Sequence, residues 1–367
     1  MYPRVSLAYF VTPHGFGHAA RASAVMEAVY ERWPFVRFEI FGNTPEWFFA
    51  DGLSVPHACH AAQTDIGMVQ QSSLHVDLEK TVEALDAFLP FDENQLDALA
   101  ARLRDLDCRA VICDISPLGI AVGKRAGLPT VLVENFTWDW IYRGYPAAEN
   151  GLNKHIDYLA DLFAAADDRI QVEPACVSAD CVLRTPPVSR KPKMPAASVR
   201  QRLAIDSHEK MVLITMGGTP ETHAFVDKLH HAAGAGEARF VIPGRYPDLP
   251  AEGKRRGNAT FLPHRSAFYH PDLVFAADAV VGKVGYSTVS EVYHAGVAFG
   301  YITRPDFPES GCLAAYADAN MPAVSIEAEE FTSGQWMSRL SELLALPGRS
   351  APAAPNVADR VADYICN

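Results

Sequence analysis

Short apolar runs alternate with segments of helical periodicity along this chain, and the alternation predicts its elements. The runs at 4–12 (RVSLAYFVT), 110–116 (AVICDIS) and 211–215 (MVLIT) are continuous and of strand length. Residues 19–29 instead repeat apolar side chains every three or four positions, as a helix packed on a core does. Strands that alternate with helices predict a doubly wound α/β fold with parallel sheets.

The remaining elements follow the same alternation. Segment 77–106 is expected to form two helical pieces broken near Pro90, and 357–367 an amphipathic helix. We expect further strands at 35–41, 130–133, 238–244, 260–262, 280–281 and 298–303, and further helices at 117–126, 198–203, 221–231 and 271–276.

A change of composition divides the chain. Residues 184–196 (RTPPVSRKPKMPA) are rich in proline and basic residues and poor in bulky aliphatic ones, which predicts an interdomain linker. A length of 367 residues also favours two domains. We therefore predict domains at 1–183 and 197–350, both Rossmann-like, and a separate C-terminal helix within 351–367.

Charge and cysteine usage exclude several classes of protein. The net charge is −12 and there is no basic block, which argues against a nucleic-acid binder but not against a nucleotide ligand. Seven scattered cysteines without a CxxC pair predict reduced thiols and a cytoplasmic protein. No apolar run is long enough to span a membrane, and no signal peptide is expected.

The stretch VVGKVGYSTVSEV at 280–292 is a candidate phosphate site. A strand, a glycine-flanked loop and a helix opening near Ser287 follow one another, and such a helix start offers free N–H groups and the positive end of the dipole. Glu291, about one turn in, is placed to accept hydrogen bonds from ribose hydroxyls. Ser287 and Thr288 could cap the helix or touch phosphate. The alternative is a plain strand–loop–helix joint with an incidental glutamate.

A second joint of the same kind lies at 216–219. Gly217, Gly218 and Thr219 follow a strand and would turn amides toward a phosphate. The alternative is a tight turn in which the glycines relieve backbone strain.

The loop HGFGH at 14–18 joins the first strand to the first helix. Gly15 and Gly17 permit a tight turn, but the third glycine of the dinucleotide-binding fingerprint is missing. A histidine at this sheet edge, His18 above all, could act as a general base; the alternative is a structural histidine that caps the helix. Arg21, one turn on, could steady an anion or pair with a carboxylate, and His14 flanks the turn.

Other side chains are expected near strand ends. Asp114 and Glu134 end two strands, where open α/β sheets place ligand contacts, although Asp114 could equally cap the next helix. The aromatic cluster at 138–142 could form a sugar-stacking wall, core packing or a membrane-surface contact. Asp306 and Glu309, on a proline-rich loop, could bind sugar hydroxyls or be solvated.

Together these motifs resemble the glycosyltransferases of the GT-B fold. The resemblance is closer to the family that contains the N-acetylglucosaminyl transferase of peptidoglycan lipid synthesis, and closer still to the glycosyltransferase-like N-terminal part of plant L-arabinokinase. It covers nearly the whole chain. The segments that carry it are HGFGHAAR at 14–21, MGGT at 216–219, FLPH at 261–264, GKVGYSTVSE at 282–291 and RPDFPESG at 304–311.

The resemblance implies a cleft between two Rossmann-like domains, with a nucleotide-diphosphate sugar held mainly by the second. The final helix would pack back on the first domain. The donor-binding residues implied are Gly217, Gly218, Thr219, Gly285, Tyr286, Ser287 and Thr288 around the diphosphate, Leu262, Pro263 and His264 at the base, Glu291 at the ribose, and Asp306 and Glu309 at the sugar. The acceptor side would comprise His14, Gly15, Gly17, His18, Arg21, Asp114 and Glu134.

The expected reaction is inverting, metal-independent transfer of a hexosyl or N-acetylhexosaminyl group from a UDP-linked donor to an unknown hydroxyl acceptor. His18 would take the acceptor proton, and the helix starts at 219 and 287 would stabilise the leaving diphosphate. No acidic pair suited to a divalent metal stands out, so neither a metal nor another cofactor is expected. The family's glutamine pair is replaced here by Asp306 to Glu309, which leaves the sugar open. The alternatives are a sugar-nucleotide epimerase and a non-catalytic sugar-nucleotide-binding module.

Overall fold

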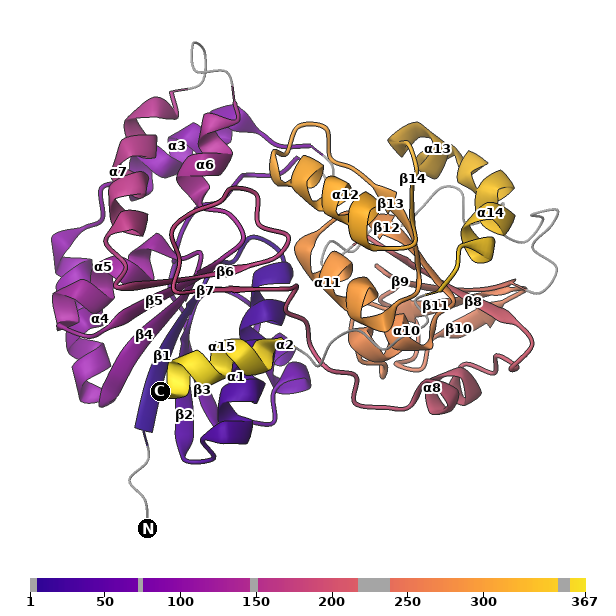
Figure 1. Cartoon of the computed structure of the whole chain (residues 1–367), viewed down its shortest axis with the longest axis horizontal. Helices are drawn as coiled ribbons and strands as arrows, with labels where there is room; N and C mark the ends of the chain where they lie inside the picture. The colour runs from indigo at the N-terminus through magenta and orange to yellow at the C-terminus, as the bar shows by residue number, and fades with distance from the viewer. Residues whose placement is uncertain (1–4, 72–74, 146–150, 217–237, 349–356) are drawn as a thin grey trace. The chain divides into compact units, whose positions relative to one another are not determined.

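The structure is a computed structural model that describes residues 5–71, 75–145, 151–216, 238–348 and 357–367. It divides into two compact units (Figure 1). The first comprises Met1–Ser189, Asp306–Glu309 and Val357–Asn367, and the second comprises Arg190–Pro305 and Ser310–Asn356. Each unit contains one seven-stranded sheet.

The first sheet is parallel and has the strand order β3-β2-β1-β4-β5-β6-β7. Its central strands are continuous apolar runs because helices cover both faces of the sheet. The bounds are β1 Val5–Val11, β2 Val36–Phe41, β3 His57–His60, β4 Cys108–Asp114, β5 Thr130–Glu134, β6 Asp168–Val172 and β7 Leu183–Thr185.

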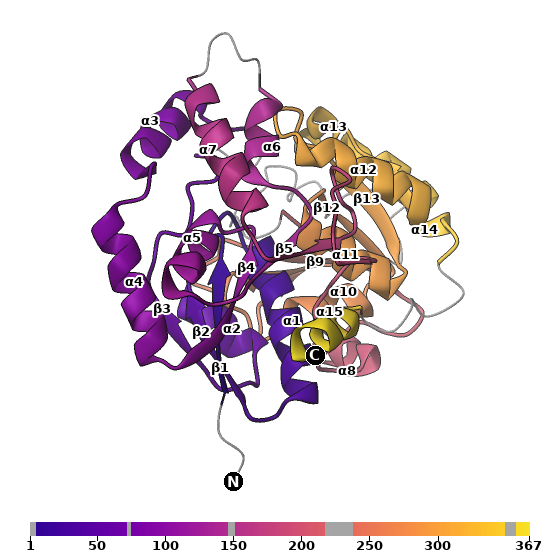
Figure 2. The same ribbon diagram turned by 60° about the vertical axis from the view of Figure 1, so that its left-hand side comes forward.

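Helices α1 and α15 lie side by side in the first unit, while α4, α5 and α7 form a separate layer (Figure 2). Arg32, near the end of α1, forms ion pairs with Asp363 and, at 3.3 Å, with Asp359 of α15. The helices of this unit are α1 Gly17–Arg32, α2 Glu46–Gly52, α3 Leu78–Phe88, α4 Glu93–Asp105, α5 Pro117–Ala126, α6 Trp138–Arg143, α7 Asn153–Ala164 and α15 Ala358–Cys366.

Two glycines let helix α5 approach the sheet closely. A Cβ atom at Gly119 would lie 2.6 Å from Cβ of Phe10, and one at Gly123 would lie 2.4 Å from Cγ2 of Thr130. Both separations are shorter than van der Waals contact, so only glycine fits at these two positions. The close packing fixes α5, and with it the end of β4 from which α5 departs.

The order of the first sheet brings distant loops together. Strand β1 lies between β2 and β4, so the chain runs outward to β3 and then crosses to the other side. Val11 of β1 pairs with Asp114 of β4. The loop after β1 and the end of β4 therefore flank a topological switch point, where open α/β sheets bind ligands.

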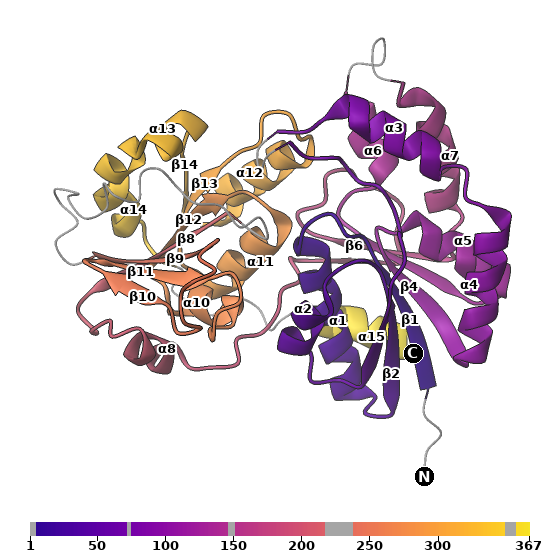
Figure 3. The same ribbon diagram turned by 180° about the vertical axis from the view of Figure 1, so that it is seen from behind.

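The second sheet has the order β10-β11-β9-β8-β12-β13-β14, parallel except for the edge strand β10 (Figure 3). Its strands are β8 Lys210–Thr215, β9 Ala238–Gly244, β10 Lys254–Arg256, β11 Ala259–Pro263, β12 Ala279–Lys283, β13 Ala298–Ile302 and β14 Ala323–Ser325. Its helices are α8 Ala196–Arg202, α10 His270–Ala276, α11 Tyr286–Ala295, α12 Glu309–Asn320, α13 Ala328–Ser333, the 3₁₀ turn η1 Gln335–Arg339 and α14 Leu340–Ala345.

Most of the predicted elements are confirmed within a few residues at their ends, but two local predictions are wrong. Residues 184 and 185 belong to strand β7, so the first part of the predicted linker is sheet. Glu309 opens helix α12 instead of lying in a loop. The predicted helix at 221–231 lies outside the described residues.

The aromatic cluster at 138–142 is largely core. Trp138 and Tyr142 are each 1% exposed and pack in the apolar core of the first unit, which excludes those two rings from contact with a membrane surface. Across the helices that the structure describes, none has the length and apolar character to cross a membrane.

Candidate active site

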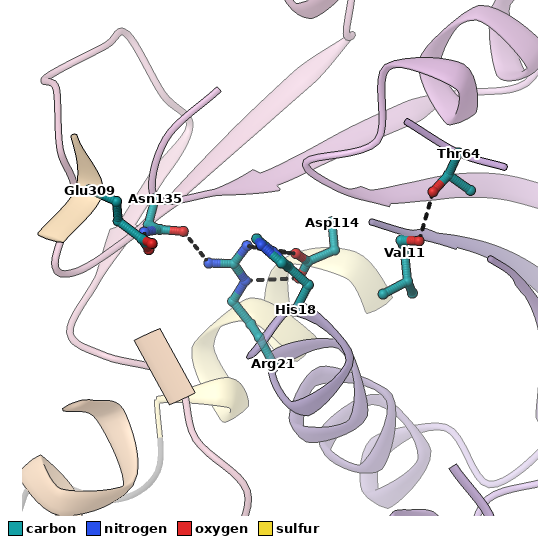
Figure 4. A network of polar contacts seen from close by, with 7 residues as sticks. All are labelled: Val11, His18, Arg21, Thr64, Asp114, Asn135 and Glu309. Atoms are coloured by element: carbon teal, nitrogen blue, oxygen red, sulfur yellow. Dashed lines mark hydrogen bonds and ion pairs between the residues drawn. The ribbon is translucent and has the colours of Figure 1, made fainter. Parts of the chain in front are cut away.

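A buried cluster joins His18, Arg21 and Asp114 at the switch point of the first sheet (Figure 4). His18 Nδ1 lies 2.9 Å from Oδ1 of Asp114. Arg21 donates from Nε to Oδ2 at 2.8 Å and from Nη2 to Oδ1 at 2.6 Å, a two-pronged contact that suits a carboxylate. The three candidates chosen separately from the sequence thus form one group.

Asp114 sets the tautomer of His18. A carboxylate only accepts, so the proton of the neutral imidazole lies on Nδ1 and the lone pair lies on Nε2. Among the described residues no hydrogen bond engages Nε2 of His18. Burial alone would raise the pKa of the Asp114 carboxyl, but the charge of Arg21 and the His18 hydrogen bond outweigh burial and lower that pKa. Asp114 therefore stays ionised, and His18 presents a free basic nitrogen.

Asn135 extends the cluster. Arg21 Nη1 donates to Oδ1 of Asn135 at 2.7 Å, and Asn135 Nδ2 donates to Oε1 of Glu309 at 2.9 Å. Glu309, which the resemblance assigned to the donor sugar, is buried and bonded within the first unit. Asn135 was not predicted, although it directly follows a candidate at the end of a buried strand.

Glu134 and His14 stand apart from this hydrogen-bonded group. Oε1 of Glu134 accepts from Gln171 at 2.8 Å, and burial raises the pKa of the Glu134 carboxyl. His14 stacks on Phe307, with 5.6 Å between ring centroids, and its Nδ1 accepts from the backbone N–H of Met68 at 3.4 Å. The two histidines of the HGFGH loop are therefore held by different neighbours.

Gly15 and Gly17 were predicted to permit a tight turn between β1 and α1, and the backbone turns there. Gly15 has φ of +76°, a left-handed conformation that favours glycine, and Gly17 is the first residue of α1. No side chain caps the start of α1.

Helix α11 in the second unit also begins without a side-chain cap. Its N-cap residue is Gly285, and a Cβ atom there would meet nothing within 4 Å. Helix α5, by contrast, is capped by Ser116, whose hydroxyl accepts from the N–H of Gly119 at 3.2 Å. In the first turn of α11, Tyr286 and Thr288 are buried and Ser287 is half-buried. A helix start of this kind suits an anion.

Glu291 lies one turn along α11 and is already ion-paired. Arg190 donates to Oε1 from Nε at 3.1 Å and from Nη2 at 2.9 Å, and His270 Nδ1 lies 2.8 Å from Oε2. Burial would raise the pKa of the Glu291 carboxyl, but Arg190 and His270 outweigh burial and lower it. The sequence analysis did not select Arg190 or His270. Arg190 stands in the proline-rich basic segment that was predicted to be a linker.

The remaining candidates occupy varied surroundings. Leu262 and Pro263 are buried in β11, whereas His264 just beyond is exposed, with a pKa lowered by partial desolvation. The Asp306 side chain is exposed, and its carbonyl oxygen accepts from Tyr145 at 2.5 Å. Gly217, Gly218 and Thr219 lie outside the described residues. In the described part of the chain no group of three or more His, Cys, Asp or Glu side chains is arranged to hold a metal ion.

The two sheets and their helices define the two-domain α/β fold of the GT-B glycosyltransferases. Over 99% of both chains the structure is similar to MurG of Acinetobacter baumannii, with a TM-score of 0.56 and 17% identity. It is also similar to a glycotransferase of kitacinnamycin (TM-score 0.62, 15% identity, 100% and 99% of the chains) and to the spinosyn forosaminyltransferase SpnP (0.60, 15%, 99% and 95%). At such identities the likeness shows the fold alone.

By sequence the chain is similar to L-arabinokinase of Arabidopsis thaliana, with 28% identity over 353 residues and 92% of this chain. The match covers 32% of that protein, so the chain spans about a third of the length of the curated relative it matches. No protein-family model matches the chain.

Proposed function

We propose that this protein is a glycosyltransferase that moves a sugar from a nucleotide-diphosphate sugar, UDP-linked, to a hydroxyl acceptor, with inversion and without a metal. The observation that carries the proposal is the pairing of His18 Nδ1 with Asp114, which leaves Nε2 free on a GT-B fold. A free imidazole nitrogen is what a general base for a hydroxyl needs near neutral pH.

In this mechanism His18 Nε2 takes the acceptor's proton while the acceptor oxygen attacks the anomeric carbon. The bond from that carbon to the diphosphate breaks in the same displacement, and a single displacement inverts the configuration. Asp114 holds the tautomer and faces the imidazolium that forms. Because Arg21 already balances the charge of Asp114, we assign Asp114 a role in orienting His18.

The second unit would hold the donor. The uncapped amides of α11 would bind the leaving diphosphate, together with Gly217, Gly218 and Thr219. A carboxylate offers about four lone-pair sites. The bonds from Arg190 and His270 use three of those of Glu291, so it can still accept from a ribose hydroxyl. Leu262, Pro263 and His264 would line the base.

The finer assignments belong to the same proposal. A hexosyl or N-acetylhexosaminyl donor, Asp306 and Glu309 at the donor sugar, no cofactor beyond the nucleotide sugar, and a cytoplasmic location all stay predictions. The similarity to part of L-arabinokinase is consistent with a sugar substrate, which belongs to the same proposal.

A thermal-shift panel of UDP, GDP, ADP, TDP and CDP with their sugar forms tests the donor site. A ligand at 100 times its dissociation constant adds about 2.7 kcal/mol to the free energy of unfolding. We expect the uridine compounds alone to raise Tm, and acceptor-dependent loss of the sugar nucleotide to follow. Absence of a shift with every nucleotide would contradict the donor site. Conversion of the donor without an acceptor would indicate an epimerase, and binding without turnover a non-catalytic module.

A further inference from the structure

Asn135 is buried in the first unit, and both polar atoms of its side chain are engaged. Its Oδ1 accepts from Nη1 of Arg21 at 2.7 Å, and its Nδ2 donates to Oε1 of Glu309 at 2.9 Å. Its backbone carbonyl accepts from the N–H of Cys176 at 2.7 Å. Because an arginine only donates and a carboxylate only accepts, the amide can lie in one orientation only. Asn135 is therefore fixed between a guanidinium and a carboxylate.

Glu309 is held in place by the segment that leads to it. Residues 306–309 belong to the first unit, and Phe307 is buried in the apolar core of that unit. Pro308 packs closely on Gly144, since a Cβ atom at that glycine would lie 2.5 Å from Cγ of the proline. These two contacts fix the backbone that leads into Glu309, and with it the carboxylate that accepts from the amide.

The nitrogen Nδ1 of His18 has two neighbours with opposite effects. Oδ1 of Asp114 lies 2.9 Å away, and Nη2 of Arg21 lies 3.4 Å away. The carboxylate requires the proton on Nδ1, whereas an arginine that donated to Nδ1 would require the lone pair there and the proton on Nε2. In the structure Nη2 of Arg21 instead donates to Oδ1 of Asp114 at 2.6 Å. The position of Arg21 therefore decides the tautomer of His18.

Asn135 lies where it can fix that position. In Figure 4 the guanidinium of Arg21 lies between Asn135 on one side and His18 with Asp114 on the other. The two bonds to Asp114 come from Nε and Nη2, and the bond to Asn135 comes from Nη1, at another corner of the planar group. Without the bond at Nη1 the guanidinium could turn on the carboxylate. A small turn would bring Nη2 from 3.4 Å to about 3.0 Å from Nδ1, a normal hydrogen-bond distance.

We propose that Asn135, held by Glu309, keeps Arg21 away from Nδ1 of His18 and thereby selects the tautomer whose Nε2 is free. Asn135 is then a positioning residue, because it acts on His18 through Arg21. The catalytic consequence rests on the proposed function, in which Nε2 is the base. The tautomer itself is a property of the folded chain and needs neither donor nor acceptor.

Nitrogen-15 NMR of the histidine side chains measures the tautomer directly, because a ring nitrogen with a proton and one with a lone pair differ in chemical shift. The chain has 13 histidines, and His18→Ala assigns the signals of His18. The spectra are recorded at about pH 8.5, where an ordinary imidazole is neutral. We expect one tautomer in the wild type, with the proton on Nδ1. In Asn135→Leu, which lacks an acceptor for Arg21, we expect a mixture of both tautomers. An unchanged tautomer in the folded variant would overturn the proposal.

A double variant separates this role from a general loss of structure. Asn135→Asp together with Glu309→Gln exchanges the two groups, so Arg21 keeps an acceptor and that acceptor keeps a donor behind it. The wild-type tautomer should persist there, and a mixture like that of Asn135→Leu would overturn the proposal by showing that Asn135 only fills the core. Asn43→Leu, at an exposed asparagine of the same unit, is the matched control and should leave the signals of His18 in place.

Asn135→Ala takes the place of the leucine variant if that variant does not fold, and the same mixture is expected. The thermal shift with UDP is measured on the same proteins and should be the same in Asn135→Leu as in the wild type. A wild type that shifts with no nucleotide would contradict the donor site and leave the tautomer result standing. Failure of the proposed function and failure of this positioning role are therefore distinguishable.

Discussion

His18 and Asp114 are 96 residues apart in the chain, yet Nδ1 of the imidazole lies 2.9 Å from Oδ1 of the carboxylate. The contact exists because β1 and β4 are neighbours in the sheet, with α1 starting just beyond the end of β1. It fixes the orientation of the imidazole ring and leaves Nε2 for the base role that we propose.

Removing the base should abolish turnover and spare donor binding. We expect His18→Ala to lower kcat by about 10²- to 10⁴-fold, the usual contribution of a general base. The thermal shift with UDP should persist, since the described residues proposed to bind the nucleotide and its diphosphate lie in the second unit. His208→Ala, at an exposed histidine, is the matched control. Retained turnover with a full donor would remove His18 from the base role.

Breaking the buried ion pair from one side should destabilise the fold. Asp114→Asn leaves the Arg21 guanidinium buried without its counter-charge, which costs about 3–5 kcal/mol in the free energy of unfolding. Urea unfolding measures the loss. The double variant Arg21→Leu with Asp114→Leu should cost less than the sum of the single changes, because no unpaired charge remains. Additive losses would show that the two side chains do not depend on each other.

Stability should fall as Asp65 ionises. Burial raises the pKa of the Asp65 carboxyl from its usual 3.8 to about 7, so the folded state binds more protons than the unfolded state between these two values. Unfolding free energy therefore decreases with rising pH across that window, by roughly 4 kcal/mol for the full shift. Asp114 contributes the opposite sign, since its lowered pKa means stability lost only at more acidic pH.

The comparison that isolates Asp65 is urea unfolding of the wild type and Asp65→Asn at pH 5 and pH 8. The difference in unfolding free energy should move in favour of the variant at pH 8. Asp114 and Tyr142, the titratable neighbours of Asp65, are present in both proteins and cancel. A difference independent of pH would place the Asp65 pKa near that of an exposed carboxyl.

Gly282, in strand β12, and Gly285, the N-cap residue of α11, should respond differently to alanine. Gly285→Ala puts a methyl group into open space at an ordinary extended φ, so Tm should change little while the Kd for UDP rises at least tenfold. Gly282→Ala would place Cβ 1.9 Å from the carbonyl oxygen of Thr215 and should lower Tm clearly. Unchanged UDP affinity in Gly285→Ala would contradict diphosphate binding at α11.

The sequence predicted the strands that are buried on both faces, because continuous apolar runs are their direct mark. It missed short, half-exposed strands such as β3 and β14, whose composition resembles that of loops. At the site, His18, Arg21 and Asp114 were each chosen for residue type and position. The three side chains meet because β1 and β4 are neighbours in the sheet. The hydrophobic periodicity of the sequence does not reveal this strand order.

The residues that were missed have a common cause. Arg190 lies in a segment whose average composition is that of a linker, and averaging hides one buried arginine. In the sequence Asn135 is an ordinary residue after a strand, and only the structure shows that the Arg21 guanidinium donates to its side chain. Contacts between residues that are far apart in sequence define both roles, so residue type alone could not reveal them.

Helix α1 carries His18 in its first turn and Arg32 at its last, and Arg32 is tied to the final helix of the chain. A helix of 16 residues is about 24 Å long. Helix α15 is therefore connected to His18, the proposed base, through the single helix α1. A displacement of α15 would therefore be transmitted along α1 to the position of the His18 imidazole ring.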